Sequence, residues 1–357
     1  MRSEPRKEDV NHPTLLIRAD ASVAIGTGHV MRCLALAQAW QGSGGKAVFA
    51  MADPSPWVCE RLRSEGMEIV HLEARPGSLD DARQVVNLAR QRAGCWIVVD
   101  GYHFDSNYQR SIKEAQVGLL FVDDAGKAGP YCADIVLNQN LHANEEMYSQ
   151  REAHTQLLTG TPYIMLRRDF TAAPERDHPI NSVARRLLVS MGGSDPDNIT
   201  AKAVEMLQTM EIPGWEAIAV LGQNSTHFAS LSDTIRGAGL PIQLVQNADM
   251  AELMHWADVA VTAGGTTIWE LAFMGVPAVA MTRGEHERML LQSAAHQGIA
   301  IDVGPFQAVA PRDLGKVVAS LAFDEARRLK MSKAGRAFVD GLGAARVVDA
   351  IRRIPCN

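Results

Sequence analysis

A histidine directly after a glycine loop near the start of the chain has the clearest potential for chemistry. The loop Gly26-Thr27-Gly28 follows a short apolar run, 15–17, and precedes apolar residues spaced every three or four positions, so it joins a predicted strand to a predicted helix. His29 would lie in the first turn of that helix, where free N–H groups and the helix dipole disfavour imidazolium. We therefore expect His29 to be neutral near pH 7 and to act as a general base. The alternative is a histidine that only caps or packs.

Two further glycine loops have the form of phosphate-binding sites. Each follows a predicted strand and begins a predicted helix, and in the first of them Asp195 and Pro196 suit the N-cap and the first helical position. Exposed N–H groups at a helix start hold phosphate, whereas the alternative for both loops is a capped turn that binds nothing. Glu270, about one turn into the second helix, is expected to accept hydrogen bonds from a ribose diol. The loop residues predicted to bind are Gly192, Gly193, Ser194, Gly264, Gly265, Thr266 and Thr267.

Polar side chains also stand where predicted strands end. Asp20 lies just past the first strand, and Asp100 and Tyr102 sit at the end of another, so all three belong to the carboxyl edge where open α/β sheets bind ligands. We expect Asp20 to orient His29 or to position a water molecule, and Asp100 and Tyr102 to contact the ligand. For each of them, capping a loop is the alternative.

Apolar, β-branched runs alternate with segments of helical period through both halves of the chain. Such alternation predicts a parallel sheet with helices on both faces, and each half opens with its own strand, glycine loop and helix. The expected strands are 14–17, 46–51, 68–72, 96–100, 118–122 and 134–137, then 186–190, 217–221, 242–245, 259–262, 278–281 and 300–303. The expected helices of the first half are 30–41, 57–66, 79–93 and 107–115.

A polar stretch with two prolines and no periodicity divides the two halves. We predict a disordered tail at 1–13, an N-terminal Rossmann-like domain carrying His29 at 14–170, a linker at 171–184 and a second Rossmann-like domain at 185–357. Two such domains facing each other across a cleft make an α/β fold of the GT-B type.

Composition excludes several classes of protein. A chain of 357 residues with 46% hydrophobic and 21% charged residues is ordinary for a globular protein of two domains. Its net charge of −6 argues against nucleic acid as a partner, and no run approaches the roughly 18 apolar residues of a membrane span. The charged first residues lack the apolar core of a signal peptide, and the five scattered cysteines suit reduced thiols, so a cytoplasmic location is expected.

The block R-x-D-x-S-x-x-I-G-x-G-H-x-x-R, from Arg18 to Arg32, resembles the opening of the UDP-2,4-diacetamido-2,4,6-trideoxy-β-L-altropyranose hydrolases of pseudaminic acid biosynthesis. Further matches lie at 99–102, 122–124, 133–138, 163–167, 190–195 and 263–271. The resemblance as a whole runs from about residue 15 to about residue 350. Trp269 stands where some relatives carry Asn, and Glu285-His286-Glu287-Arg288 departs from their Asn-Gln pair. These departures leave the contacts of both positions open.

The resemblance implies a sugar-nucleotide hydrolase of GT-B fold that works without metal or cofactor. His29 would be the base, Gly26, Gly28 and Arg32 would lie at the substrate, and Tyr102 would contact the sugar. Water attack at the anomeric carbon would invert the sugar and release UDP. A glycosyltransferase that uses a UDP-sugar donor, or a UDP-sugar-binding protein without turnover, is the alternative.

Overall fold

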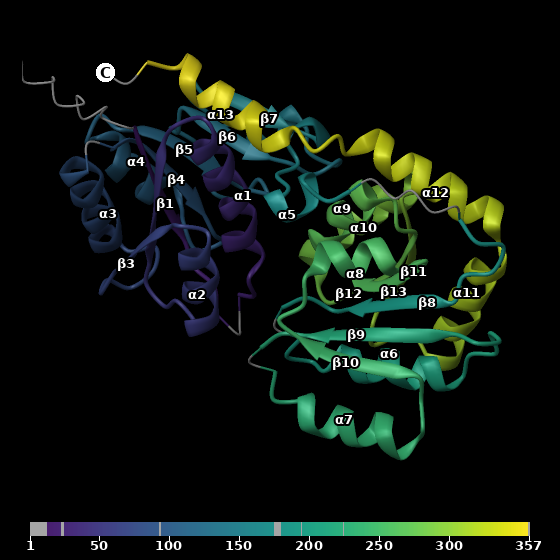
Figure 1. Cartoon of the computed structure of the whole chain (residues 1–357). Coiled ribbons are helices and arrows are strands. Elements are labelled where there is room, and N and C mark those ends of the chain that lie inside the picture. Colours follow the sequence, from purple (N-terminus) through teal and green to yellow (C-terminus); the bar gives the residue numbers. More distant parts are fainter. Residues whose placement is uncertain are drawn as a thin grey trace, which may run out of the picture.

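Two parallel β-sheets, each covered by helices on both faces, form the two lobes of the computed structural model (Figure 1). The structure describes residues 13–22, 25–92, 94–174, 180–193, 195–223 and 225–355. The predicted tail, apart from Pro13, lies outside the described residues, as do part of the predicted linker and the site residue Ser194. Within the described residues, no helix is long and apolar enough to cross a membrane.

The first sheet has seven strands in the order β3-β2-β1-β4-β5-β6-β7. Side chains alternate across it, so that Leu15 and Ile17 pack under one set of helices and Leu16 under the other, all fully buried. The strands are β1 (Thr14–Ala19), β2 (Lys46–Met51), β3 (Glu68–His71), β4 (Gly94–Asp100), β5 (Gly118–Val122), β6 (Ile135–Asn138) and β7 (Gln156–Thr159). The helical segments of this part are α1 (Gly28–Gly42), α2 (Pro56–Ser64), α3 (Leu79–Gln91), α4 (Ser106–Lys113), η1 (Glu145–Tyr148), η2 (Thr161–Tyr163) and α5 (Arg168–Thr171).

The second sheet has six strands in the order β10-β9-β8-β11-β12-β13, which repeats the order of the first. The strands are β8 (Arg186–Ser190), β9 (Glu216–Leu221), β10 (Ile242–Gln246), β11 (Val259–Ala263), β12 (Ala278–Thr282) and β13 (Ala300–Pro305). The helices are α6 (Ile199–Gln208), α7 (Phe228–Gly237), α8 (Met250–Trp256), α9 (Thr267–Met274), α10 (Glu285–His296), α11 (Pro311–Phe323) and α12 (Glu325–Phe338).

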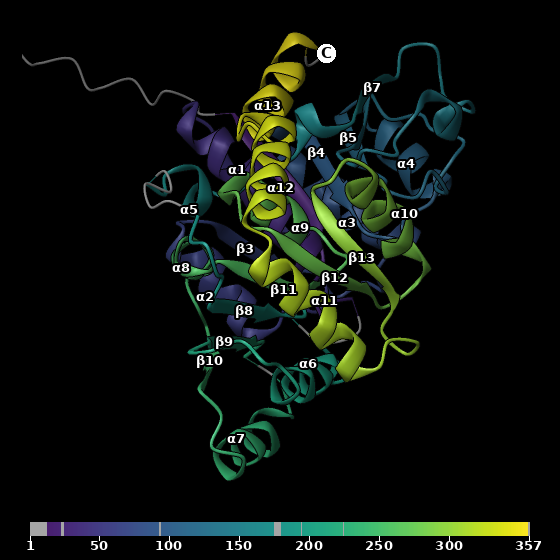
Figure 2. The same ribbon diagram turned by 90° about the vertical axis from the view of Figure 1, so that its right-hand side faces the viewer.

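The last described helix, α13 (Gly343–Arg353), leaves the second lobe and packs on α1 of the first. Both views show it lying along that helix (Figure 1; Figure 2). Val347 and Ile351 are fully buried in the same core as Leu34 and Leu36 of α1. The region 343–353, which follows the second lobe in sequence, therefore completes the core of the first.

The strand order confirms the predicted GT-B fold and places a crevice in each lobe. All twelve expected strands form, and β7 joins the first sheet as an additional edge strand. In each sheet the direction of winding reverses between two neighbouring strands, β1 and β4 in one and β8 and β11 in the other. Their following connections diverge to opposite faces, which leaves a crevice outside the carboxyl ends of those strands where ligands bind.

Candidate functional site

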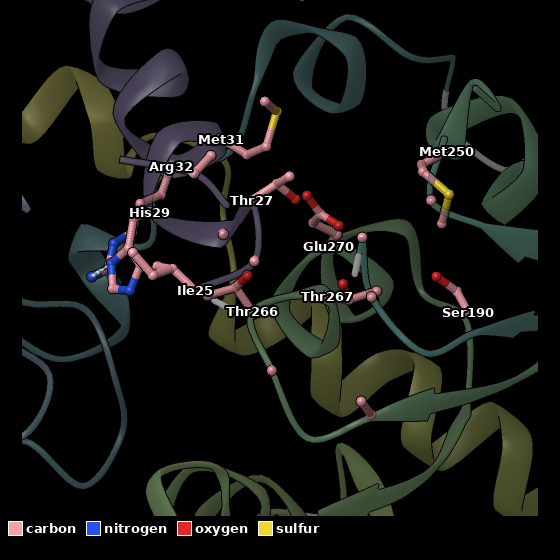
Figure 3. A pocket seen from close by; sticks show the side chains of 18 of the residues that line it. Ile25, Thr27, His29, Met31, Arg32, Ser190, Met250, Thr266, Thr267 and Glu270 are labelled. Carbon is pink, nitrogen blue, oxygen red and sulfur yellow. Dashed lines mark hydrogen bonds between the residues drawn. The ribbon is translucent and has the colours of Figure 1, made fainter. Parts of the chain in front are cut away.

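A cavity of about 320 Å³ lies between the two lobes and is lined from both crevices. In Figure 3, His29 lies toward one end of the group, Met250 and Ser190 toward the other, and Thr266, Thr267 and Glu270 between them. Twelve of the fifteen predicted site residues line it; they are Gly26, Gly28, His29, Arg32, Tyr102, Gly192, Gly193, Gly264, Gly265, Thr266, Thr267 and Glu270. The described part of the chain contains no group of three or more His, Cys, Asp or Glu side chains able to hold a metal ion.

His29 is held by a carboxylate behind it. The ring is 7% exposed, and its Nδ1 lies 2.7 Å from Oδ1 of Asp100, which is fully buried at the end of β4. Because a carboxylate only accepts hydrogen bonds, Nδ1 carries the proton, and in the neutral imidazole Nε2 keeps the lone pair. Tyr102 packs edge-on against the ring, with centroids 4.8 Å apart. The arrangement is that of a base with its orienting acid.

Arg32 keeps Asp100 ionised. It lies one turn after His29 on the same face of α1, and its Nε and Nη2 lie 2.5 and 2.6 Å from the two oxygens of Asp100. Its Nη1 pairs with Asp124. Burial alone would raise the pKa of Asp100, but the charge of Arg32 and the hydrogen bonds from Arg32 and His29 outweigh it and hold that pKa far below its usual range. Arg32 thus lines the cavity and also holds the carboxylate that orients His29.

Asp20 does not orient His29, and this prediction is wrong. Its Oδ1 accepts the N–H of Ala52 at 2.8 Å, and its Oδ2 lies 2.7 Å from Arg18 and 3.5 Å from His103. β1 lies between β2 and β4, so a side chain that follows β1 can turn to either neighbour. Asp20 is held by Ala52, directly after β2, whereas Asp100 ends β4 and meets His29.

The surroundings of Asp20 predict a loss of stability in acid. Burial would raise its pKa, but the nearby His103 and the charge of Arg18 lower it to about 2, from 3.8. A carboxyl group with a lowered folded-state pKa stabilises the fold above about pH 4, and this contribution of about 2 kcal/mol is lost as the pH falls toward 2. The free energy of unfolding, measured by denaturant between about pH 5 and pH 2.5, should therefore fall less for Asp20→Asn than for the wild type. Equal slopes would contradict the assignment.

The three glycine loops differ in whether a side chain caps the free N–H groups at the start of the helix that follows. At α9, Thr266 makes no side-chain cap, and at α1 Thr27 makes none. The predicted start of α6 at Pro196 is wrong, because the helix begins at Ile199 and the carboxylate of Asp195 accepts its first N–H groups at 2.8 and 3.0 Å. Asp195 therefore satisfies the start of α6, so a ligand on this side would meet the backbone of the Gly192–Gly193 loop before the helix, whereas at α9 and α1 the helix starts themselves offer N–H groups to the cavity.

Contacts across the cleft involve three residues, Arg167, Asn140 and Trp269, to which the sequence analysis gave no role in the site. Glu270 meets Arg167 of the other lobe, with Oε1 and Nη2 3.4 Å apart, and burial raises the pKa of Glu270 against the opposing effect of Arg167. Trp269 is 1% exposed and donates from Nε1 to Oδ1 of Asn140 at 3.3 Å. The indole at this position thus serves the junction of the lobes. Arg167 ends the segment 163–167, which is one of the matches to the hydrolase family, and this match is the signal by which the sequence could have pointed to Arg167.

Comparisons with known proteins match the chain to a glycosyltransferase domain and to two relatives. Residues 188–346 match the model of the glycosyltransferase family 28 C-terminal domain. The chain is 30% identical over 230 residues to the spore coat polysaccharide biosynthesis protein SpsG of Bacillus subtilis, covering 64% of this chain and 67% of that protein. It is 23% identical over 267 residues to the UDP-2,4-diacetamido-2,4,6-trideoxy-beta-L-altropyranose hydrolase of Campylobacter jejuni, covering 72% and 86%.

A solved structure shares the fold over nearly its whole length. The S. aureus MnaA–UDP co-structure superimposes with a TM-score of 0.67 at 12% identity, covering 95% of this chain and 96% of that one. The likeness extends over both lobes, as expected for a GT-B fold. On the evidence of SpsG and of the fold, the chain belongs to the SpsG family, a GT-B family of sugar-nucleotide-related proteins.

Proposed function

We propose that this protein hydrolyses a UDP-activated amino sugar, UDP-2,4-diacetamido-2,4,6-trideoxy-β-L-altrose, to the free sugar and UDP, as a step of pseudaminic acid biosynthesis. The observation that carries the proposal is the pair of His29 and buried Asp100 at the wall of a cavity whose opposite wall holds two glycine loops. A base on one side and phosphate-binding loops on the other are what attack at an anomeric carbon requires. The Campylobacter hydrolase, the more distant of the two relatives, supports the choice of substrate.

The nucleotide would lie along the cavity from Met250 to His29 (Figure 3). The uracil ring would pack near Leu221, which ends β9, and Met250, which follows β10, and the ribose diol would donate to Glu270. The diphosphate would rest on the loops of Gly193 and Gly265, at the ends of β8 and β11. This order brings the sugar to His29 and Tyr102.

The reaction needs one proton acceptor and a stabilised leaving group. Nε2 of His29 takes a proton from water as the water oxygen bonds to the anomeric carbon, and the bond from that carbon to the diphosphate oxygen breaks with both electrons going to UDP. Asp100 stabilises the imidazolium that forms. N–H groups of the two glycine loops hold the charge that develops on UDP.

The experiment that tests the proposal follows UDP release from the diacetamido-altrose nucleotide and, separately, from UDP-GlcNAc, with and without EDTA, in water enriched in 18-O. We expect rapid, EDTA-insensitive release from the altrose nucleotide, with the label in the sugar and none in UDP. Label in the phosphate would exclude attack at carbon. Tight UDP binding without release from either nucleotide would exclude hydrolysis of these substrates.

Gly222→Ala should weaken UDP binding through the neighbouring loop. A Cβ at Gly222 would lie 1.8 Å from the carbonyl oxygen of Gly193, so the Gly193 loop must move. We expect the dissociation constant of UDP, measured by calorimetry, to rise by about tenfold or more, which is at least 1.4 kcal/mol. Gly237→Ala is the matched control, because a Cβ there meets nothing within 4 Å. Unchanged affinity in Gly222→Ala would place the diphosphate elsewhere.

A glycosyltransferase is the second candidate, and the match of residues 188–346 to the family 28 glycosyltransferase domain favours it. In that case His29 would deprotonate an acceptor alcohol in place of water. The release assay separates the two candidates, since a transferase releases UDP in proportion to added acceptor and a hydrolase releases it without any.

A further inference from the structure

Arg283 and Glu287 form an ion pair at the cavity wall that is held by several hydrogen bonds, called the clamp below. Glu287 belongs to the segment 285–288, which differs from the Asn-Gln pair of the relatives, and Arg283 lies in the loop before it. Glu287 is 3% exposed, and its Oε2 accepts the backbone N–H of Arg283 while its Oε1 accepts Nε, both at 2.8 Å. Nη2 of the same guanidinium also donates to Oε1. The carboxylate thus fixes the plane of the guanidinium with several hydrogen bonds. Both residues line the cavity.

The clamp aims the outer end of Arg283 at the glycine loops. Nη1 lies 3.4 Å from the point where a Cβ on Gly192 would stand, and it has no hydrogen-bond partner among the described residues. On the other side, Glu287 approaches the second loop, with its Oε1 3.7 Å from the Cβ position of Gly265 and its own Cβ 3.3 Å from that of Gly264. The pair therefore joins the loops that follow β8 and β11.

Strand order indicates which end of a nucleotide this pair meets. Arg283 follows β12, whereas Leu221 ends β9 and Met250 follows β10, so β8 and β11 separate the two positions in the sheet. A nucleotide with its base near Met250 and its phosphates over β8 and β11 would present its outer phosphate to β12. The outer phosphate carries the oxygen that leaves the sugar.

We propose that Arg283 binds the β-phosphate of the nucleoside diphosphate and stabilises it as the leaving group, with Glu287 as the residue that positions it. This inference rests on the proposed nucleotide-sugar chemistry. Arg283 is then a catalytic residue, since its free N–H donors touch the oxygens that gain charge as the carbon–oxygen bond breaks. The ion pair is neutral overall, so its contribution comes from oriented donors, and Glu287 serves without touching the sugar.

The test compares the binding of UDP and UMP, which differ by the β-phosphate, to the wild type and to variants. Arg283→Ala should weaken UDP binding by about tenfold or more and leave UMP binding within about twofold, as calorimetry measures. Because this variant removes the guanidinium that pairs with the buried carboxylate of Glu287, the double variant Arg283→Ala/Glu287→Gln is made beside it. The double variant should show the same loss of UDP binding with UMP binding unchanged. Because Gln replaces the buried carboxylate, the double variant also avoids the cost in stability of a buried charge that has lost its cation.

Glu287→Gln alone tests the positioning role. With the charge of the clamp removed, we expect the affinity ratio of UDP to UMP to fall, and kcat for UDP release to fall more than KM rises, because the interaction strengthens in the transition state. Lys316→Ala, which removes an exposed cation far from the cavity lining, is the control and should change neither.

Three outcomes overturn the inference. Equal losses for UDP and UMP in the double variant would show a structural role, wild-type affinity for UDP would show no contact, and an unchanged UDP to UMP ratio in Glu287→Gln would remove the positioning role. Failure of the proposed function is distinct from these, since it appears as absent UDP binding or absent turnover in the wild type itself.

Discussion

His29→Ala is expected to lower the rate of UDP release from the altrose nucleotide by about 10² to 10⁴ while UDP still binds. Because Nδ1 of His29 donates a hydrogen bond to Asp100, Nε2 carries the lone pair of the ring, and His29 lines the cavity. Alanine removes this nitrogen, which is the only group proposed to take the proton of water. The rate is measured as initial UDP release at saturating substrate, and the dissociation constant of UDP by calorimetry. The loss belongs to the chemical step, so kcat should fall and UDP affinity should change little.

The matched control is His71→Ala, since His71 is an exposed histidine at the end of β3, away from the cavity lining. Its rate should equal that of the wild type. If His29→Ala retained most of the activity, another group would be the base. If the wild type itself released no UDP, that result would favour the glycosyltransferase or the binding protein over the hydrolase.

Asp100→Asn should have the second large effect and should act in two ways. Without the carboxylate, the imidazolium that forms during the reaction loses its stabilising charge, and the tautomer of His29 is no longer fixed, so we expect kcat to fall by about 10² or more. Arg32 also loses a fully buried partner, which is expected to lower the free energy of unfolding by about 3 kcal/mol. Denaturant unfolding and initial rates, each measured on the folded fraction, separate the two effects.

Asp124→Asn is the matched control for Asp100→Asn. It removes the other carboxylate of Arg32 and leaves the hydrogen bond between His29 and Asp100 in place. We expect it to preserve far more activity than Asp100→Asn. Equal losses in the two variants would mean that the effect passes through Arg32 and that Asp100 does not serve His29 directly.

The sheet and its loops follow from local patterns, and this is why so much of the fold was predictable. Apolar runs such as 186–190 and 118–122 begin and end as the pattern predicts, because parallel strands buried on both faces must be continuously apolar. β7 escaped prediction because the two apolar residues of Gln156–Thr159 are Leu157 and Leu158, which lack the β-branched apolar side chains that marked the expected strands.

The residues around His29 depended on strand order, which periodicity does not contain. Asp20 and Asp100 both end strands, and a sequence shows no reason to prefer one as the partner of His29. Once β4 lies beside β1, the choice falls to Asp100, while Asp20 is bonded to Ala52 after β2. The links from Glu270 to Arg167 and from Trp269 to Asn140 depend on how the two lobes meet, which no single segment encodes.

Since α13 packs on α1, a ribosome delivers the last helix of the first lobe only after it has made the entire second lobe. The core that contains Leu34 and Leu36 therefore cannot be completed by Val347 and Ile351 until the intervening residues have been synthesised. The second lobe, whose strands and main covering helices all lie between Arg186 and Phe338, can close its core earlier. Folding during translation is thus expected to finish in the lobe that begins first, and until then the apolar side chains of α1 that α13 covers are open to chaperones.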